Sequence, residues 1–224
     1  LYSIPHRIKN FKSKKTLIVG SGAGNDVAAS LRDSDAIIDA VEIDPLVADL
    51  GIKFHPEKPY LNKRVKLTIN DARNFIKETN KKYDLIIYSI LDSHANLSGK
   101  GGVRLDSYVY TKESFYEAKQ KLNNNGIIIL SFAISTREMG IKVYKMLNES
   151  FKANPPIVLT RNDPDKFIDN IYIFAVSDDK IDIDLFDTNF KRTNLFIPGS
   201  SIKKVDMSTD DWPFFYMSYR VYPL

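Results

Sequence analysis

Short apolar runs alternate with amphipathic stretches over much of the chain. The runs that we interpret as strands are 16–20, 36–43, 65–69, 84–91 and 126–132. Helical patterns are spaced between and after them, near 25–32, 45–54, 71–79, 111–122 and 136–152. The last of these helices opens with Ser135 and Glu138 at the spacing of a capping box. Near-continuous apolar strands that alternate with helices are typical of a parallel sheet covered on both faces.

The alternation stops after about residue 152. Two further apolar runs follow, 156–160 and 170–177, with only a polar loop between them. Strands joined in this way predict an antiparallel hairpin at the end of a parallel sheet. We therefore expect an α/β fold of the Rossmann-like, doubly wound type, with a mostly parallel seven-stranded sheet and a C-terminal antiparallel hairpin.

Length and charge suggest three parts in this chain of 224 residues. We expect a basic arm at 1–15, a ligand-binding domain at 16–180, and a C-terminal extension at 181–224 packed on the domain. The arm carries five basic side chains and no acid, which gives it a charge of +5. Because the net charge of the chain is +4, the remaining residues together carry a charge of −1. Such an arm can touch nucleic acid, lie beside the cytoplasmic face of a membrane, or be a solvated linker.

Composition excludes several kinds of chemistry. The chain has no cysteine, which rules out disulfides, thiolate zinc sites and cysteine nucleophiles. Its longest apolar runs, such as GIIILSFAI at 126–134, are about half as long as a membrane span requires.

The chain begins at Leu1 instead of methionine, so we expect a fragment or a processed product.

A glycine-rich turn follows the first strand, in VGSGAGND at 19–26. Glycines allow a tight turn and a close approach of a ligand to the backbone. We therefore assign Gly20, Ser21, Gly22 and Gly24 to ligand binding, with a purely structural turn as the alternative. The dinucleotide fingerprint requires glycine where Asn25 stands.

Polar residues also follow the second and third strands. Glu42, with Ile43 beside it, lies about 20 residues beyond the glycine turn, where an acid accepts hydrogen bonds from ribose hydroxyls. The carboxylate of Asp71 either accepts a hydrogen bond from the exocyclic amine of an adenine or caps the next helix. We assign its neighbour Ala72 to the same binding site. Successive strands of an open parallel sheet gather ligands at their carboxyl edge, so we expect these residues to lie together.

The fourth strand leads into a candidate reacting centre in IYSILDSHANLSGKGG, residues 87–102. We assign Asp92 as the catalytic residue and Ser89 to the ligand pocket, and expect the glycine-containing loop 95–104 to act as a lid. Weaker candidates for substrate or lid contacts are Ser93, His94 and Tyr110. None of these assignments involves a metal ion.

Taken together, these motifs resemble the spermidine synthase family of aminopropyltransferases, which share the class I methyltransferase fold. The resemblance covers roughly residues 14–135 and rests on LIVGSGAGNDV, AVEIDP, NDARNFIKET, KYDLIIYSILD and YTKESFYEAKQKLNNNGIIIL. It implies a pocket for S-adenosylmethionine or its decarboxylated form, with Glu42 on the ribose and Asp71 near the adenine. Two positions depart from the family pattern, since Ala23 and Ser89 stand where the family usually has acids.

The tail STDDWPFFY at 208–216 resembles that of bacterial membrane-associated spermidine-synthase-like proteins. This resemblance implies the cytosolic domain of a membrane protein, with membrane contact through flanking segments, and a homo-oligomer is compatible with it. The leading hypothesis is an aminopropyltransferase acting on a small-molecule amine. The alternatives are a methyltransferase, a non-catalytic nucleoside-binding domain, and a nicotinamide-dependent oxidoreductase, which Asn25 and the terminal hairpin disfavour. Nucleic acid is not an expected partner, because no aromatic platform accompanies the basic arm.

Overall fold

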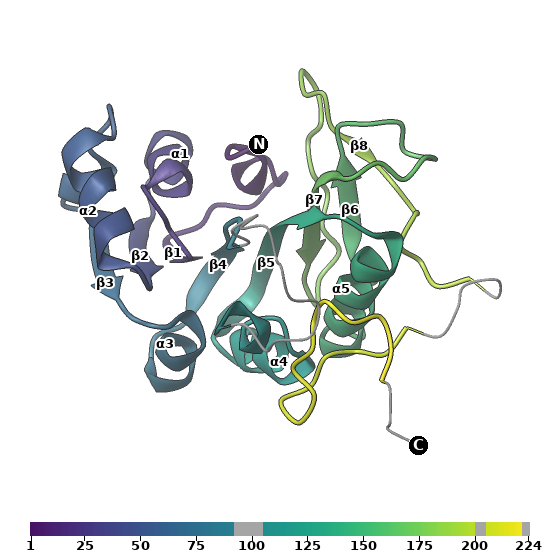
Figure 1. Ribbon diagram of the computed structural model, residues 1–224. Helices are drawn as coiled ribbons and strands as arrows, with labels where there is room; N and C mark the ends of the chain where they lie inside the picture. Colours follow the sequence, from purple (N-terminus) through teal and green to yellow (C-terminus); the bar gives the residue numbers. More distant parts are fainter. Residues whose placement is uncertain (92–104, 200–204, 221–224) are drawn as a thin grey trace.

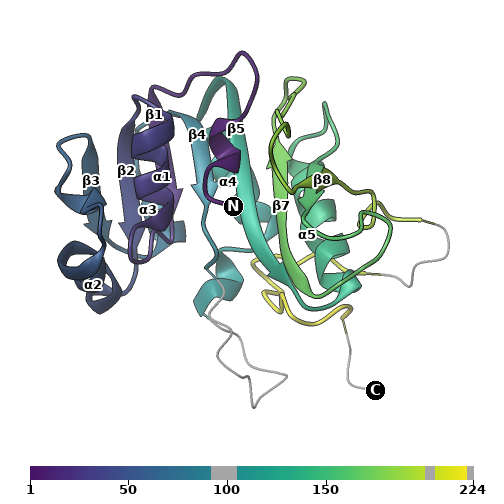
Figure 2. The ribbon, with the colours of Figure 1, turned by 90° about the horizontal axis from the view of Figure 1, so that it is seen from above.

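A twisted sheet of eight strands organises the protein (Figure 1), in a computed structural model that describes residues 1–91, 105–199 and 205–220. The strands are β1 (Lys15–Val19), β2 (Ile37–Glu42), β3 (Val65–Ile69), β4 (Tyr83–Tyr88), β5 (Leu122–Ile134), β6 (Ile157–Thr160), β7 (Asn170–Val176) and β8 (Lys191–Arg192). Their order is β3-β2-β1-β4-β5-β7-β6-β8, with β6 labelled beside β7 in Figure 1 and the other strands seen from above in Figure 2.

The sheet is parallel from β3 to β5 and antiparallel from β5 to β8. The predicted antiparallel pair is confirmed, because β6 pairs with β7 in this sense. The expected number of seven strands is wrong, since β8 adds an eighth along β6. This strand consists of two exposed basic residues, so no apolar run marks it in the sequence.

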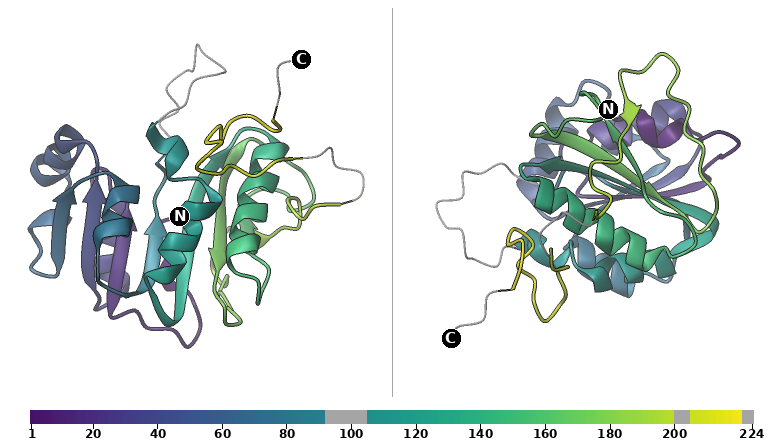
Figure 3. Two further views of the ribbon diagram at one scale, coloured as in Figure 1. Left: turned by 90° about the horizontal axis from the view of Figure 1, so that it is seen from below. Right: turned by 90° about the vertical axis from the view of Figure 1, so that its right-hand side faces the viewer.

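Helices cover both faces of the sheet, as the right-hand view of Figure 3 shows. They are α1 (Asn25–Asp33), α2 (Pro45–Phe54), α3 (Ala72–Glu78), α4 (Lys112–Gln120) and α5 (Arg137–Ser150), with short 3-10 turns at η1 (Ile4–His6), η2 (Pro59–Leu61) and η3 (Leu105–Tyr108). One core joins the sheet to α3, α4 and α5. The other joins it to α1 and the N-terminal segment. None of the helices within the described ranges is long and apolar enough to cross a membrane.

Side-chain caps fix where several helices begin. The carboxylates of Asp44 and Asp71 accept backbone N–H groups in the first turns of α2 and α3. At α5 the expected capping box is wrong, because Thr136 instead of Ser135 caps the helix by accepting from Met139 N. Both positions carry a hydroxyl, and the capping pattern does not distinguish two adjacent hydroxyls.

The N-terminal segment packs against the body of the protein. Ile4 and Ile8 are buried in the same core as α1, and Ile8 forms a bridge with Ile183. The imidazole of His6 hydrogen-bonds the hydroxyl of Ser30 in α1 at 2.9 Å. The division into three parts at residues 15 and 180 stays a prediction.

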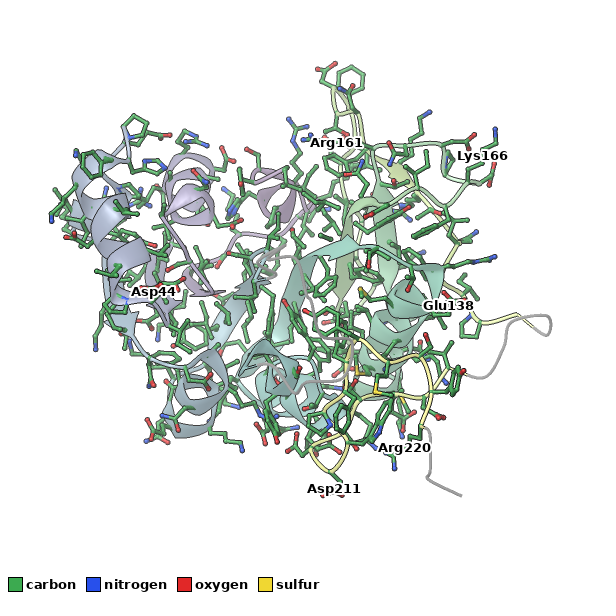
Figure 4. All side chains as sticks on the ribbon, in the orientation of Figure 1. Asp44, Glu138, Arg161, Lys166, Asp211 and Arg220 are labelled. Carbon is green, nitrogen blue, oxygen red and sulfur yellow. The ribbon has the colours of Figure 1, made fainter. Side chains whose placement is uncertain are left out.

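Two buried cations connect the C-terminal segment to the helices. The guanidinium of Arg73 in α3 donates paired hydrogen bonds to Glu117 of α4 and to Asp210 of the tail. The ammonium of Lys142 in α5 donates to Phe214 O at 3.2 Å and lies over the Trp212 ring. Burial lowers the pKa of this lysine to about 7. Figure 4 labels Asp211 and Arg220 of this segment, far from Asp44 at the start of α2.

We expect Arg73→Ala to lower the free energy of unfolding by about 3–5 kcal/mol, because it strips two carboxylates of a buried partner. The matched control is Lys77→Ala on the same helix, because the Lys77 side chain is 52% exposed and its ammonium lies 4.0 Å from the same Glu117. That change should cost less than about 1 kcal/mol. Urea unfolding measures the free energy of unfolding of both variants. Equal losses would contradict the inference that Arg73 connects the C-terminal segment to α3 and α4.

Candidate functional site

The polar residues predicted to meet at the sheet do so at the carboxyl ends of three neighbouring strands. β1 lies between β2 and β4, and the chain continues from β1 toward β2 and β3 on one side and from β4 toward β5 on the other. This reversal is the topological switch point, where open α/β sheets form a crevice for ligands. The glycine turn follows β1, Glu42 ends β2, and Ser89 follows β4 directly.

The glycine turn has backbone conformations that L side chains rarely adopt. Gly20, Gly22 and Gly24 have φ of 68°, 55° and 102°. A Cβ at position 24 would stand 2.7 Å from the Pro59 side chain, whereas one at position 22 would meet nothing closer than 4.0 Å. Glycine is thus required for packing at 24, while the backbone at 22 stays open to a ligand.

Glu42 is buried and holds this turn against β2. Its Oε2 accepts the backbone N–H of Gly22 at 2.7 Å, and its Oε1 accepts those of Ile43 and Asp44 at 2.9 Å each. A carboxylate has about four lone-pair directions. Three are used, so one remains on Oε2 for a ligand hydroxyl.

The phenol of Tyr60 supports the other side of the turn. It donates to the carbonyl of Gly22 at 2.6 Å, and its oxygen lies 2.9 Å from the hydroxyl of Ser21. Burial raises the pKa of Tyr60 to about 12, and the negative charges of Glu42 and Asp26 add to this rise. The charges of Glu42 and Asp26 therefore both act on the Tyr60 phenol beside the glycine turn.

Asp26 is a second buried acid at this edge, in the first turn of α1. Ser89 at the end of β4 is buried as well, and its hydroxyl has no hydrogen-bond partner among the described residues. Burial raises the pKa of Asp26 to about 6, and the Ser89 hydroxyl and the positive chain terminus oppose the rise. The Ser89 backbone is tied to β1 by its N–H, which donates to Val19 O at 3.1 Å.

The other predicted residues are placed less directly. Asp71 caps α3, with its carboxylate accepting from Asn74 N at 2.8 Å, and Ala72 is buried beneath it. Tyr110 is buried between Phe132 and Phe215, so its ring is part of the core. The roles assigned to these residues stay predictions.

The strand before the candidate reacting centre is shorter than predicted, because β4 ends at Tyr88 and not at residue 91. Asp92, Ser93, His94 and the loop 95–104 lie outside the described residues. Among the residues that the structure does describe, no group of three or more histidine, aspartate or glutamate side chains is arranged to hold a metal ion.

Sequence reasoning missed two members of the site, Asp26 and Tyr60. Asp26 is visible in the GND triplet at 24–26, where an acid in the first turn of a helix that follows a glycine turn is a usable signal. Tyr60 is separated from Gly22 by 38 positions, and its neighbours in PYL give no local indication of a role.

Comparison with known proteins identifies relatives of this architecture. The family model of the spermine/spermidine synthase domain matches residues 3–185. A polyamine aminopropyltransferase of Saccharolobus solfataricus is 32% identical over 151 residues, covering 62% of this chain and 46% of the relative. The chain thus spans about half the length of that curated relative.

Two solved structures share the fold. A spermidine synthase from Thermotoga maritima aligns over 98% of this chain and 68% of its own, with a TM-score of 0.59 and 16% identity. Human methyltransferase-like protein 13, solved in complex with SAH, aligns over 78% of this chain and 76% of its own, with a TM-score of 0.57 and 19% identity. The fold is therefore of the class I methyltransferase type, and the chain belongs to the spermine/spermidine synthase domain family.

Proposed function

We propose that this chain is the nucleoside-binding and transferase part of a polyamine aminopropyltransferase. The donor is decarboxylated S-adenosylmethionine, and the acceptor is a small amine of the polyamine type. The observation that carries the proposal is the pairing of Glu42 with the Gly22 N–H at the switch point of a chain in this family. This pairing places a carboxylate and an open stretch of backbone side by side, where the ribose of a nucleoside can bind.

In the proposed reaction a neutral amine attacks the carbon bonded to the donor's sulfonium sulfur. A C–N bond forms, the C–S bond breaks with its electron pair going to sulfur, and the amine loses one proton. The leaving group is the uncharged thioether methylthioadenosine. A carboxylate beside the amine holds the cationic form and accepts its proton, a contribution of roughly 100- to 10,000-fold, and we propose Asp92 for this part.

The described residues fit the nucleoside of this donor. Glu42 keeps one lone-pair direction for a ribose hydroxyl, and the open side of Gly22 admits the ligand against the backbone. Asp71 lies after β3, next along the same sheet edge, where we propose that it approaches the adenine. Membrane association stays a prediction from the tail motif.

Glu42→Ala should weaken the binding of methylthioadenosine by about 5- to 150-fold, which corresponds to the 1–3 kcal/mol of a lost buried hydrogen bond. Calorimetric titration measures this, with Glu78→Ala, an exposed acid on α3, as the control. The sharper comparison uses the analogue that lacks both ribose hydroxyls. The parent should prefer the hydroxylated ligand, and Glu42→Ala should lose this preference. An unchanged preference would remove Glu42 from the ribose site.

The reaction type is tested by incubating the chain with decarboxylated S-adenosylmethionine and putrescine, and separately with S-adenosylmethionine. We expect methylthioadenosine and an aminopropylated amine in equal amounts from the first mixture, as measured by mass spectrometry. A methylated amine from the second mixture would indicate a methyltransferase instead. Tight nucleoside binding without any product would indicate a non-catalytic domain, for which the substitutions Ala23 and Ser89 give a reason.

A further inference from the structure

The helix α2 carries large apolar side chains on its outer face. Leu46, Leu50 and Phe54 are 72%, 52% and 74% exposed, whereas the buried residues of this helix are Ala48 and Gly51. Because the three exposed residues are spaced four positions apart, they lie along one face, which we call the apolar stripe. A surface helix normally turns its large apolar residues toward the core. The apolar stripe thus has no partner among the described residues.

The inner face of α2 rests on the glycine turn. A Cβ at Gly51 would stand 2.5 Å from the carbonyl oxygen of Ala23 and 2.8 Å from the Tyr60 ring, so only glycine fits there. This close contact fixes which face of the helix points inward. Rotating α2 to bury the apolar stripe would press larger side chains against the turn, so the packing of the helix keeps the stripe exposed.

The apolar stripe is part of a patch large enough for an interface. Leu61 in η2, the segment that packs beside α2, is also exposed. At such exposures the four side chains present roughly 500 Å² of apolar surface, near the upper end for the largest patch of a typical monomer. A standard interface takes about 800 Å² from each partner, which the patch reaches with a polar rim. The helix lies at the edge of the molecule, on the side opposite α5 (Figure 1).

The charges beside the stripe favour a second copy of the chain as the partner. Asp49 and Lys53 form an ion pair at 2.6 Å, and helical spacing places both on one flank of the stripe. When two α2 helices meet antiparallel about a two-fold axis, this flank faces the same flank of the other copy. Each carboxylate then approaches an ammonium of the other chain. A parallel arrangement would set this flank against the one that carries Val47.

The order of residues in the stripe also suits pairing with itself. Leu46 and Phe54 lie four residues before and after Leu50. In the antiparallel pair, Leu50 therefore meets Leu50 of the second copy, and Leu46 meets Phe54. An anionic lipid surface, in contrast, attracts a rim made of cations alone. The carboxylate of Asp49 beside the stripe makes such a surface the poorer partner.

We propose that the apolar stripe is a homodimer interface in which two α2 helices pack antiparallel about a two-fold axis at Leu50. Each copy covers the stripe of the other, and the side chains of Asp49 and Lys53 close one edge of the contact. The dimer thereby holds in place the helix that backs the glycine turn. This inference does not depend on the proposed function, because no stripe residue is assigned to the nucleoside or to the reaction.

Sedimentation equilibrium tests the interface. The parent chain of 25.6 kDa should reach twice that mass as its concentration rises to about 0.1 mM, which suffices for an interface of less than standard size. Leu50→Glu should remain a monomer, because two like charges would meet at the axis. The matched control is Phe186→Glu, which alters an exposed apolar residue between β7 and β8 and should dimerise as the parent does. Circular dichroism checks that each variant is folded.

A parent that stays monomeric would overturn the proposal, whether the stripe then binds vesicles of anionic lipid or nothing. A dimer that survives Leu50→Glu would overturn it as well, because the contact would then lie elsewhere. Loss of the dimer in Phe186→Glu would have the same consequence.

Single cysteines test the arrangement of the two helices, since the chain has no cysteine of its own. Leu50→Cys should form a disulfide between two copies under mild oxidation, because the two positions meet at the axis. Leu46→Cys and Phe54→Cys should cross-link faster with each other in a mixture than either does with itself. Phe186→Cys is the control and should stay unlinked. Faster cross-linking of each stripe variant with itself would indicate parallel helices and overturn the proposal.

Discussion

The turn from β1 into α1 depends on the carboxylate of Glu42. Three glycines allow the backbone to reverse over the sheet edge, but their freedom also makes such a turn costly to order. Glu42 accepts the N–H of Gly22 on one side and two N–H groups of the β2–α2 connection on the other. One buried side chain thus connects two loops, and it sets the spacing of the surface on which a nucleoside is proposed to lie.

The described parts of the two terminal segments complete the layers behind that surface. The N-terminal segment packs Ile4 and Ile8 against the core of α1. The C-terminal segment is fixed on the opposite face by Arg73 and Lys142. Because buried ion pairs are strict about geometry, they specify where α3, α4 and the tail meet more than they add to stability.

Local patterns in the sequence predicted most elements of this fold. The apolar runs located β3 and the antiparallel pair of β6 and β7, and the helical pattern near 45–54 located α2. The pattern did not predict β8, because this strand consists of two charged residues. It also placed the end of β4 too late, since the strand ends at Tyr88. The spacing of acids after successive strands indicated the ligand edge. It did not indicate Tyr60, because its hydrogen bond to Gly22 joins segments far apart in the chain.

The central claim is that the carboxyl ends of β2, β1 and β4 form the nucleoside site. A crystal structure of the chain with methylthioadenosine tests it most directly. The account predicts the ribose beside Glu42, with the ligand lying against the backbone at Gly22 and its thioether arm directed toward Ser89. Density for the nucleoside elsewhere, as in the cavity of about 580 Å³ lined by His6, Lys12 and Asp33 at the amino ends of the strands, would contradict it.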